Sequence, residues 1–182
     1  MKKTNLYVPA LLVLVFTFFT ACVRDTDFDQ AEDITLTPVV ELDLIYFNLE
    51  ANDFFDSSTS NPRLTVTDTT ELPFLDDGFV QDDLRKADFL FKFTNSIPRN
   101  FDVNFQFLNP ENVETYSTQT SIAPGSTNNP QPTDFTETVE GQELIDLTQA
   151  SKVVVSVTIE SSNENLEGEL NLKSKTTYHL EL

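Results

Sequence analysis

The sequence predicts an all-β fold, an antiparallel β-sandwich of about seven or eight strands behind an N-terminal export segment. Three observations support this fold class. Apolar and polar residues alternate with a period of two in several segments, Thr, Val, Ile and Phe are common while Ala is rare, and no long amphipathic helical pattern occurs. The 182 residues suffice for one domain with a single hydrophobic core.

Residues 1–21 have the layout of a secretory signal peptide. Lys2 and Lys3 give a short positive region, residues 8–20 are mostly apolar, and Thr20 and Ala21 are small. A membrane-spanning helix needs about 20 apolar residues, and the run is shorter than that. The segment is therefore predicted to be removed on export.

The segment Phe19-Thr20-Ala21-Cys22 resembles the lipobox of bacterial lipoproteins, although Phe19 stands where Leu is commonest. The resemblance implies cleavage before Cys22 and acylation of its sulfur. Each buried methylene of an acyl chain contributes about 0.8 kcal/mol, so several chains anchor a domain of this size. Because Cys22 is the single cysteine of the chain, an intramolecular disulfide is excluded.

Residues 22–35 are predicted to form an acidic tether between the lipid and the domain. They include Asp25, Asp27, Phe28 and Asp29. This stretch resembles the acidic export signal that follows the lipidated Cys in surface-exposed lipoproteins of the Bacteroidota. The resemblance implies a surface-exposed position on the outer membrane. The alternative is a disordered acidic tether on a lipoprotein that faces the periplasm.

The charge balance limits the partners of the exported chain. Without residues 1–21 it has 30 acidic and nine basic side chains, a formal charge near −21. Nucleic acid binding needs clustered Lys and Arg, which are absent here. The same surplus repels anionic lipid headgroups. The membrane is therefore expected to be a partner through the acyl chains alone.

Alternating patterns place the strands within residues 36–182, the predicted sandwich domain. The clearest candidates are residues 40–46, 89–94, 101–107, 153–160 and 170–182, with shorter ones at 72–75 and 135–139. In the first, Ile45, Phe47 and Leu49 fill the second face, which indicates a bulge or full burial. Residues 144–147 fit either a short strand or one helical turn.

The two central strands are rich in Phe. Phe89, Phe91 and Phe93 alternate on the first, while Phe101, Phe105 and Phe107 alternate on the second. Residues 95–100 are predicted to join them as a hairpin loop. Phe at regularly inward positions favours a hydrophobic core. A carbohydrate-stacking surface is the alternative, but the chain has no Trp to strengthen it.

Two polar segments, residues 56–70 and 117–133, are predicted to be long surface loops. Strands at this spacing, joined by turns, indicate a sandwich similar to the immunoglobulin fold or to another Greek-key domain. Such a resemblance of pattern does not define a function.

The usual catalytic groups are missing from the sequence. Its single histidine, His179, falls on the outward face of the last strand. No Gly-x-Ser-x-Gly motif, Gly-rich phosphate loop or His-Glu-x-x-His zinc pair occurs. We therefore expect a non-enzymatic binding, adhesive or structural module with a protein or glycan partner. The alternative is a carboxylate-dependent glycan hydrolase.

No cofactor is expected, with Ca²⁺ as the one candidate ligand. Several carboxylate oxygens lie close together on a predicted loop, which suits a hard cation: Asp76, Asp77, Asp82 and Asp83. This arrangement would correspond to a calcium-stabilised adhesion domain. The simpler interpretation is a solvated acidic turn.

Overall fold

A computed structural model describes residues 35–75 and 77–182. The chain divides into two units, Met1–Thr35 and Leu36–Leu182, and the second is described below. The predictions for Cys22, Asp25, Asp27, Phe28 and Asp29, and for Asp76, lie outside the described residues. Within the described part, no helix is long and apolar enough to cross a membrane.

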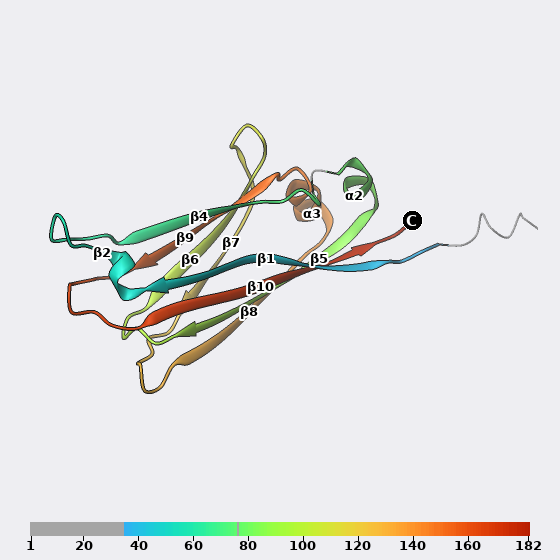
Figure 1. The fold of residues 1–182 in the computed structure, drawn as a ribbon. Helices are drawn as coiled ribbons and strands as arrows, with labels where there is room; N and C mark the ends of the chain where they lie inside the picture. The colour runs from blue at the N-terminus through green and yellow to red at the C-terminus, as the bar shows by residue number, and fades with distance from the viewer. Residues whose placement is uncertain (1–34, 76) are drawn as a thin grey trace, which may run out of the picture. The chain divides into compact units, whose positions relative to one another are not determined.

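The domain consists of two four-stranded antiparallel sheets (Figure 1). The first has the order β1 (Val39–Glu50), β10 (Glu169–Leu180), β5 (Leu84–Asn95) and β8 (Gln131–Val139). The second has the order β4 (Thr65–Glu71), β9 (Lys152–Ile159), β6 (Phe101–Leu108) and β7 (Glu114–Ile122). Shorter elements connect them: η2 (Ala51–Phe54), β2 (Phe55–Asp56), β3 (Asn61–Pro62), α2 (Gly78–Asp83) and α3 (Gly141–Leu147).

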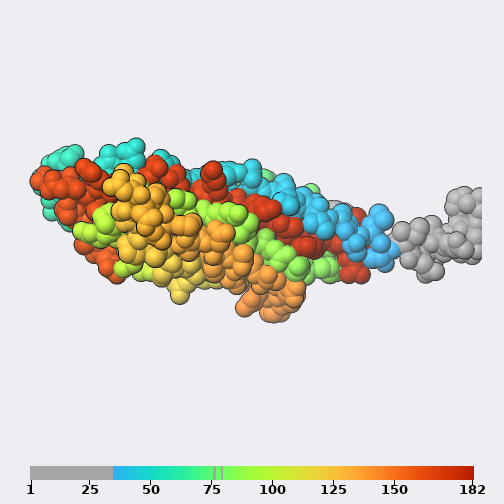
Figure 2. Space-filling view, turned by 90° about the horizontal axis from the view of Figure 1, so that it is seen from below, coloured from blue at the N-terminus to red at the C-terminus, as the bar shows by residue number. Residues whose placement is uncertain are grey.

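The strand order defines a jelly roll. When the eight long strands are counted along the chain, the sheets have the orders 1-8-3-6 and 2-7-4-5, which is the double Greek key of jelly-roll domains. Figure 2 shows the outer face of the first sheet, with β1, β10, β5 and β8 side by side. The all-β sandwich is therefore confirmed, and its connections follow the Greek-key alternative to the immunoglobulin order.

The aromatic rows of β5 and β6 meet in the interior. Phe89, Phe91, Phe101, Phe105 and Phe107 are at most 1% exposed. The rings of Phe91 and Phe105 lie 4.1 Å apart between centroids, and those of Phe89 and Phe107 lie 5.4 Å apart. Such pairs contribute about 0.5–1.5 kcal/mol beyond the burial of apolar area. The Phe rows are therefore core, as the alternation predicts.

The connection between these two strands is not a hairpin. β5 pairs with β10 and β8, whereas β6 pairs with β7 and β9. Residues 96–100 therefore cross from one sheet to the other, and the Phe rows face each other across the sandwich. Alternation alone gives each strand an inward row, but it does not say whether the next strand pairs beside it or packs opposite it.

The predicted irregularity in β1 is a bulge. The register between β1 and β10 shifts between Asp43 and Tyr46, and both Leu44 and Ile45 are buried. The Ser174 hydroxyl of β10 satisfies the backbone at this point. It accepts a hydrogen bond from Ile45 N at 3.0 Å and donates one to Ile45 O at 2.8 Å. The buried hydroxyl therefore supplies the hydrogen bonds that the backbone ladder does not make at the bulge.

Three local predictions are wrong. The supposed loops contain β4 and most of β7, while residues 72–75 form a turn. β4 and β7 are outer strands rich in Thr and Ser, so they have few apolar residues to reveal their period. In β4 only Val66 and Thr70 are less than fully exposed. The ambiguous segment 144–147 belongs to helix α3, which buries Leu144 and Leu147.

Candidate functional site

Four connections meet at one end of the sandwich, called here the loop end. They join β1 to β4, β5 to β6, β7 to β8 and β9 to β10. Figure 1 shows β2 and these connections at one end, and α2, α3 and the C-terminus at the other. Because β1 starts beside the C-terminal residue, with Leu36 N donating to Leu182 O at 3.1 Å, the loop end lies opposite the start of the domain.

A buried amide holds the loop end in place. Asn95 is 0% exposed, and all of its polar groups are paired. Its Nδ2 donates to Arg99 O at 3.0 Å and to Ala123 O at 2.8 Å, and its Oδ1 accepts from Ile97 N at 2.8 Å. One side chain thus fixes two connections to the end of β5. A fully satisfied buried polar group of this kind specifies one geometry.

Two glycines allow the connections to approach each other closely. A Cβ at Gly125 would clash with the backbone oxygen of Asn95. A Cβ at Gly168 would lie 2.5 Å from the backbone oxygen of Ser96, and Gly168 has a φ of +111°. Only glycine adopts that φ without strain. Ser96 then closes the contact, since its hydroxyl accepts from Glu169 N at 2.8 Å.

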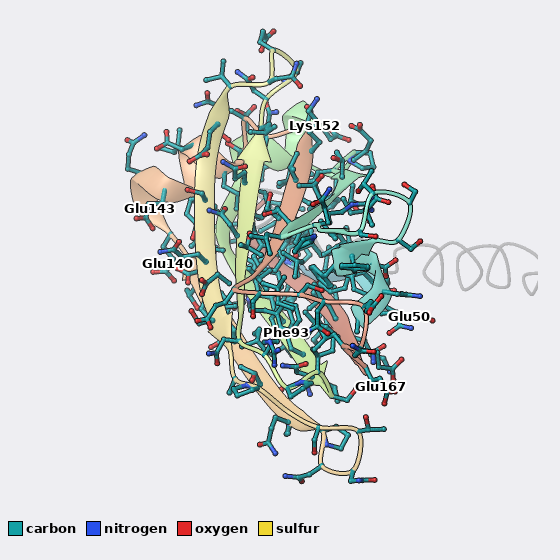
Figure 3. All side chains as sticks on the ribbon, turned by 90° about the vertical axis from the view of Figure 1, so that its left-hand side faces the viewer. Glu50, Phe93, Glu140, Glu143, Lys152 and Glu167 are labelled. Atoms are coloured by element: carbon teal, nitrogen blue, oxygen red, sulfur yellow. The ribbon has the colours of Figure 1, made fainter. Side chains whose placement is uncertain are left out.

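Two adjoining hollows of about 490 and 540 Å³ lie over the rigid frame that Asn95, Ser96, Gly125 and Gly168 form. They share Ser96, Thr127, Leu166 and Glu167. Figure 3 looks onto the loop end and shows Glu50 and Glu167 on the same side of it. The other lining residues come from all four connections and are mostly polar: Glu50, Ala51, Asn52, Pro98, Arg99, Ser126, Pro130, Asn163, Asn165, Gly168 and Glu169.

Some polar side chains on the hollows have no protein partner. Within the described residues, the side chains of Asn52, Thr127 and Glu167 make no hydrogen bond or ion pair, and all three are exposed. Asn95 and Ser96 beneath them are hydrogen-bonded, so these groups are carried on a fixed support. Amide, hydroxyl and carboxylate groups in this arrangement can exchange hydrogen bonds with a ligand rich in hydroxyl groups.

A third hollow of about 630 Å³ lies on the outer face of the second sheet. Asp102, Asn104, Gln119, Ser121, Ser156 and Thr158 line it. Asp102 accepts a hydrogen bond from Ser121 at 2.7 Å, while the buried Oδ1 of Asn104 has no partner within the described part. Outward polar residues are normal on a solvated sheet face, so the loop end remains the stronger candidate.

Sequence reasoning missed Asn95, Ser96 and the two close-packed glycines. Asn95 and Ser96 fall at the edge of a segment that looked like an ordinary turn, and their partners in other connections, Ala123 and Glu169, are distant in sequence. The presence of only four glycines in the chain was the available signal, because glycine in a β protein often marks a close backbone approach.

His179 lies on the outer face of the first sheet, as predicted, but it has a partner. Its Nε2 lies 2.8 Å from Asp88 Oδ2, and Lys86 Nζ lies 2.8 Å from the same oxygen. Thr138 Oγ1 donates to Asp88 Oδ1 at 2.8 Å. Partial burial raises the pKa of Asp88, but the hydrogen bonds from Lys86, Thr138 and His179 outweigh it and hold that pKa below its usual value.

The acidic residues proposed for calcium lie around α2. Asp77 and Asp82 are exposed, and Asp83 is partly buried. Among residues 35–75 and 77–182, no group of three or more His, Cys, Asp or Glu side chains could hold a metal ion. The set proposed from the sequence also includes Asp76, which falls outside those ranges, so a calcium site formed by all four carboxylates stays a prediction.

No protein-family model matches the chain, and no curated protein matches its sequence. Among solved structures, it is similar to VP2 of an infectious bursal disease virus subviral particle, with 7% identity and a TM-score of 0.48 over 79% of this chain and 32% of VP2. It is also similar to a candidate secreted protein from Parabacteroides distasonis, with 12% identity and a TM-score of 0.45 over 63% of this chain and 37% of that one.

The chain thus spans about a third of the length of these two proteins. Likeness at this level adds nothing to the fold that the strand order already defines. Fold and site together define a β-sandwich domain of jelly-roll topology with a preorganised, polar loop end.

The close approach at Gly125 can be tested by substitution. We expect Gly125→Ala to lower the free energy of unfolding by about 3 kcal/mol, because the added methyl group overlaps the backbone of Asn95. Gly78→Ala is the matched control, since nothing lies within 4 Å of a Cβ there. Urea denaturation of the full-length chain measures both variants, and equal midpoints would contradict the rigid frame.

The Asp88 cluster predicts a pH dependence. A lowered pKa in the folded state means that ionised Asp88 stabilises the fold above about pH 4, the ordinary range of Asp, and that this contribution is lost as the pH falls through the folded-state pKa. The difference in stability between wild type and Asp88→Asn should therefore shrink between pH 6 and pH 3. Thermal unfolding at each pH measures it, with Asp134→Asn as the control for loss of one charge.

Proposed function

We propose that this protein is a surface-exposed lipoprotein of the outer membrane whose jelly-roll domain is a non-enzymatic binding module. The acyl chains on Cys22 hold it to the membrane, and the loop end binds the partner. One observation carries the proposal above all: the polar, preorganised loop end lies at the opposite end of the sandwich from Leu36, where the chain leaves the tether.

The position of the loop end, opposite the start of the domain, suits an anchored binding domain. A chain attached through its N-terminus has the start of β1 nearest to the point of attachment. The connections at the far end of the strands are then the part of the domain most accessible to partners from outside. Connections supported by a rigid scaffold are also where binding residues concentrate in proteins.

The loop end favours a glycan as the partner. Its unbonded Asn52, Thr127 and Glu167 side chains supply the amide, hydroxyl and carboxylate groups that pair with sugar hydroxyls. Leu166 and Pro130 add small apolar surfaces beside them. Among the residues that the structure describes, no aromatic ring lines either hollow, so binding to a single sugar would be weak. Several chains on one membrane would raise the avidity.

The anchor is tested at Cys22. We expect Cys22→Ala to move the protein from the membrane fraction to the soluble fraction, because the variant has no sulfur for the acyl chains. Mass spectrometry of the wild type should find a lipid-modified Cys22 at the N-terminus. Protease added to intact cells should remove the domain of the wild type. Membrane retention of Cys22→Ala, or an unmodified thiol in the wild type, would refute the anchor.

The loop end is tested on an array of purified polysaccharides. The double variant Asn52→Ala with Glu167→Gln should weaken binding to any glycan that the wild type retains by about tenfold, since two uncommitted polar groups are removed. Glu143→Gln in α3, at the other end of the domain (Figure 1), should bind as the wild type does.

Two outcomes would count against this site. Unchanged binding by the double variant would place the ligand elsewhere. Release of reducing sugar by the wild type would instead favour the carboxylate-dependent hydrolase, in which a pair of acids such as Glu50 and Glu167 would be required for turnover.

A further inference from the structure

The two lateral sides of the sandwich differ. Where β7 and β8 lie at the edges of their sheets, polar side chains join them: Tyr116 and Thr118 donate hydrogen bonds to Glu137 at 3.3 and 3.2 Å. Burial, with the adjacent Glu137 carboxylate, raises the pKa of Tyr116, so its hydroxyl stays protonated as a donor. These hydrogen bonds therefore close the gap between the two sheets on the side of β7 and β8.

On the other lateral side, an apolar cleft opens between β1 and β4. Its apolar lining comes from Phe47 and Leu49 of β1, Val66 of β4, and Val155 and Val157 of β9, and Thr67 and Asp68 of β4 add polar groups at its rim. Val155 and Val157 are 1% and 2% exposed and form its floor. The cleft measures about 170 Å³, and a cavity of roughly 150 Å³ accepts a benzene-sized group. It therefore has room for one large apolar side chain.

Among the strands that the structure describes, β4 pairs with β9 alone, so its edge beside this cleft has no neighbour there. Leu64 O accepts from Ile159 N, and Leu72 N donates to Ser151 O. Backbone groups alternate in direction along a strand, so the even-numbered residues of β4 face β9. The odd-numbered residues then point their N–H and C=O groups outward: Thr65, Thr67, Thr69 and Glu71.

These outward groups form a template for another strand. The Thr69 N–H is taken by the neighbouring Asp68 Oδ1 at 2.8 Å. The Thr67 N–H makes no hydrogen bond within the described part of the chain. An edge with unpaired donors and acceptors binds an extended peptide backbone in preference to other ligands, because it matches the spacing of a strand.

The charge on the two edge strands restricts the partner. β1 and β4 contain five acids and no basic residue: Glu41, Asp43, Glu50, Asp68 and Glu71. Within residues 35–75 and 77–182, Glu41 is the one acid of these five with an ion pair, to Lys175 of β10. Asp68 lies at the middle of β4, so pairing two copies of β4 about that residue would place two carboxylates opposite each other. Like charges directly opposite destabilise a strand pair.

We infer that β4 accepts an extended segment of another protein, which adds a fifth strand to the second sheet and places apolar side chains over the cleft, while basic side chains on its other face reduce its charge repulsion from the acids of β1 and β4. The backbone of the segment bonds to the outward groups of Thr65 and Thr67. This interaction requires neither the lipid anchor nor the loop end, so it is separate from glycan binding.

The test uses the full-length chain in detergent and a fluorescent hexapeptide of alternating Val and Lys. Fluorescence anisotropy should show saturable binding, at least about tenfold weaker for the peptide with Glu in place of Lys. Thr67→Pro removes the outward N–H without touching the ladder to β9 and should lower affinity at least about tenfold. Thr67→Val is the matched control, since it keeps the N–H and should bind as the wild type does.

Asp68→Lys provides a second variant that keeps every backbone group, and it should shift the preference towards the Glu peptide. Equal binding by Thr67→Pro and Thr67→Val would overturn the proposal. So would self-association of the wild type that Thr67→Pro abolishes, because the occupant would then be a second copy. If Thr67→Pro does not fold, the outcome for Asp68→Lys decides: an unchanged preference overturns the proposal.

Discussion

The contact between the Phe rows of β5 and β6 is the interaction on which the rest of this domain depends. With one cysteine in the chain, and that residue outside the domain, no disulfide holds the two sheets together, so packing must do so. Phe91 on Phe105 and Phe89 on Phe107 join the central strands of opposite sheets. The other six long strands are joined to these two through backbone ladders, and the connections that form the loop end start from the ends of the long strands.

The jelly-roll order makes the two ends of the sandwich different from each other. All but one of the connections between consecutive long strands cross from one sheet to the other; the exception is the hairpin from β6 to β7. Four of the crossings collect at the loop end, where Asn95, Gly125 and Gly168 allow them to touch. The helices α2 and α3 occupy the opposite end with the C-terminus (Figure 1). The two ends of one sandwich thus differ in chemistry.

The sequence predicted what depends on local alternation. The inward rows of β5, β6, β9 and β10, the bulge in β1 and the outward position of His179 all follow from a period of two. It could not predict what depends on pairing between distant residues. Asp88 and His179 are 91 positions apart and meet because β5 and β10 are neighbours. β4 was missed because an outer strand such as Thr65–Glu71 packs too little apolar surface to show its period. The loop end was missed because Asn95 and Ser96 are bonded to residues of other connections.

The adjacency of β1 and β10 has a mechanical consequence. These strands run antiparallel through ten paired positions, from Val39 with His179 to Glu50 with Glu169. A force between Leu36 and the loop end acts along the axis of β1, so it shears the whole ladder at once instead of opening it one bond at a time. Unfolding under load is governed by the height of the barrier to that event. A domain pulled in this direction therefore resists force better than one whose strands are separated one hydrogen bond at a time.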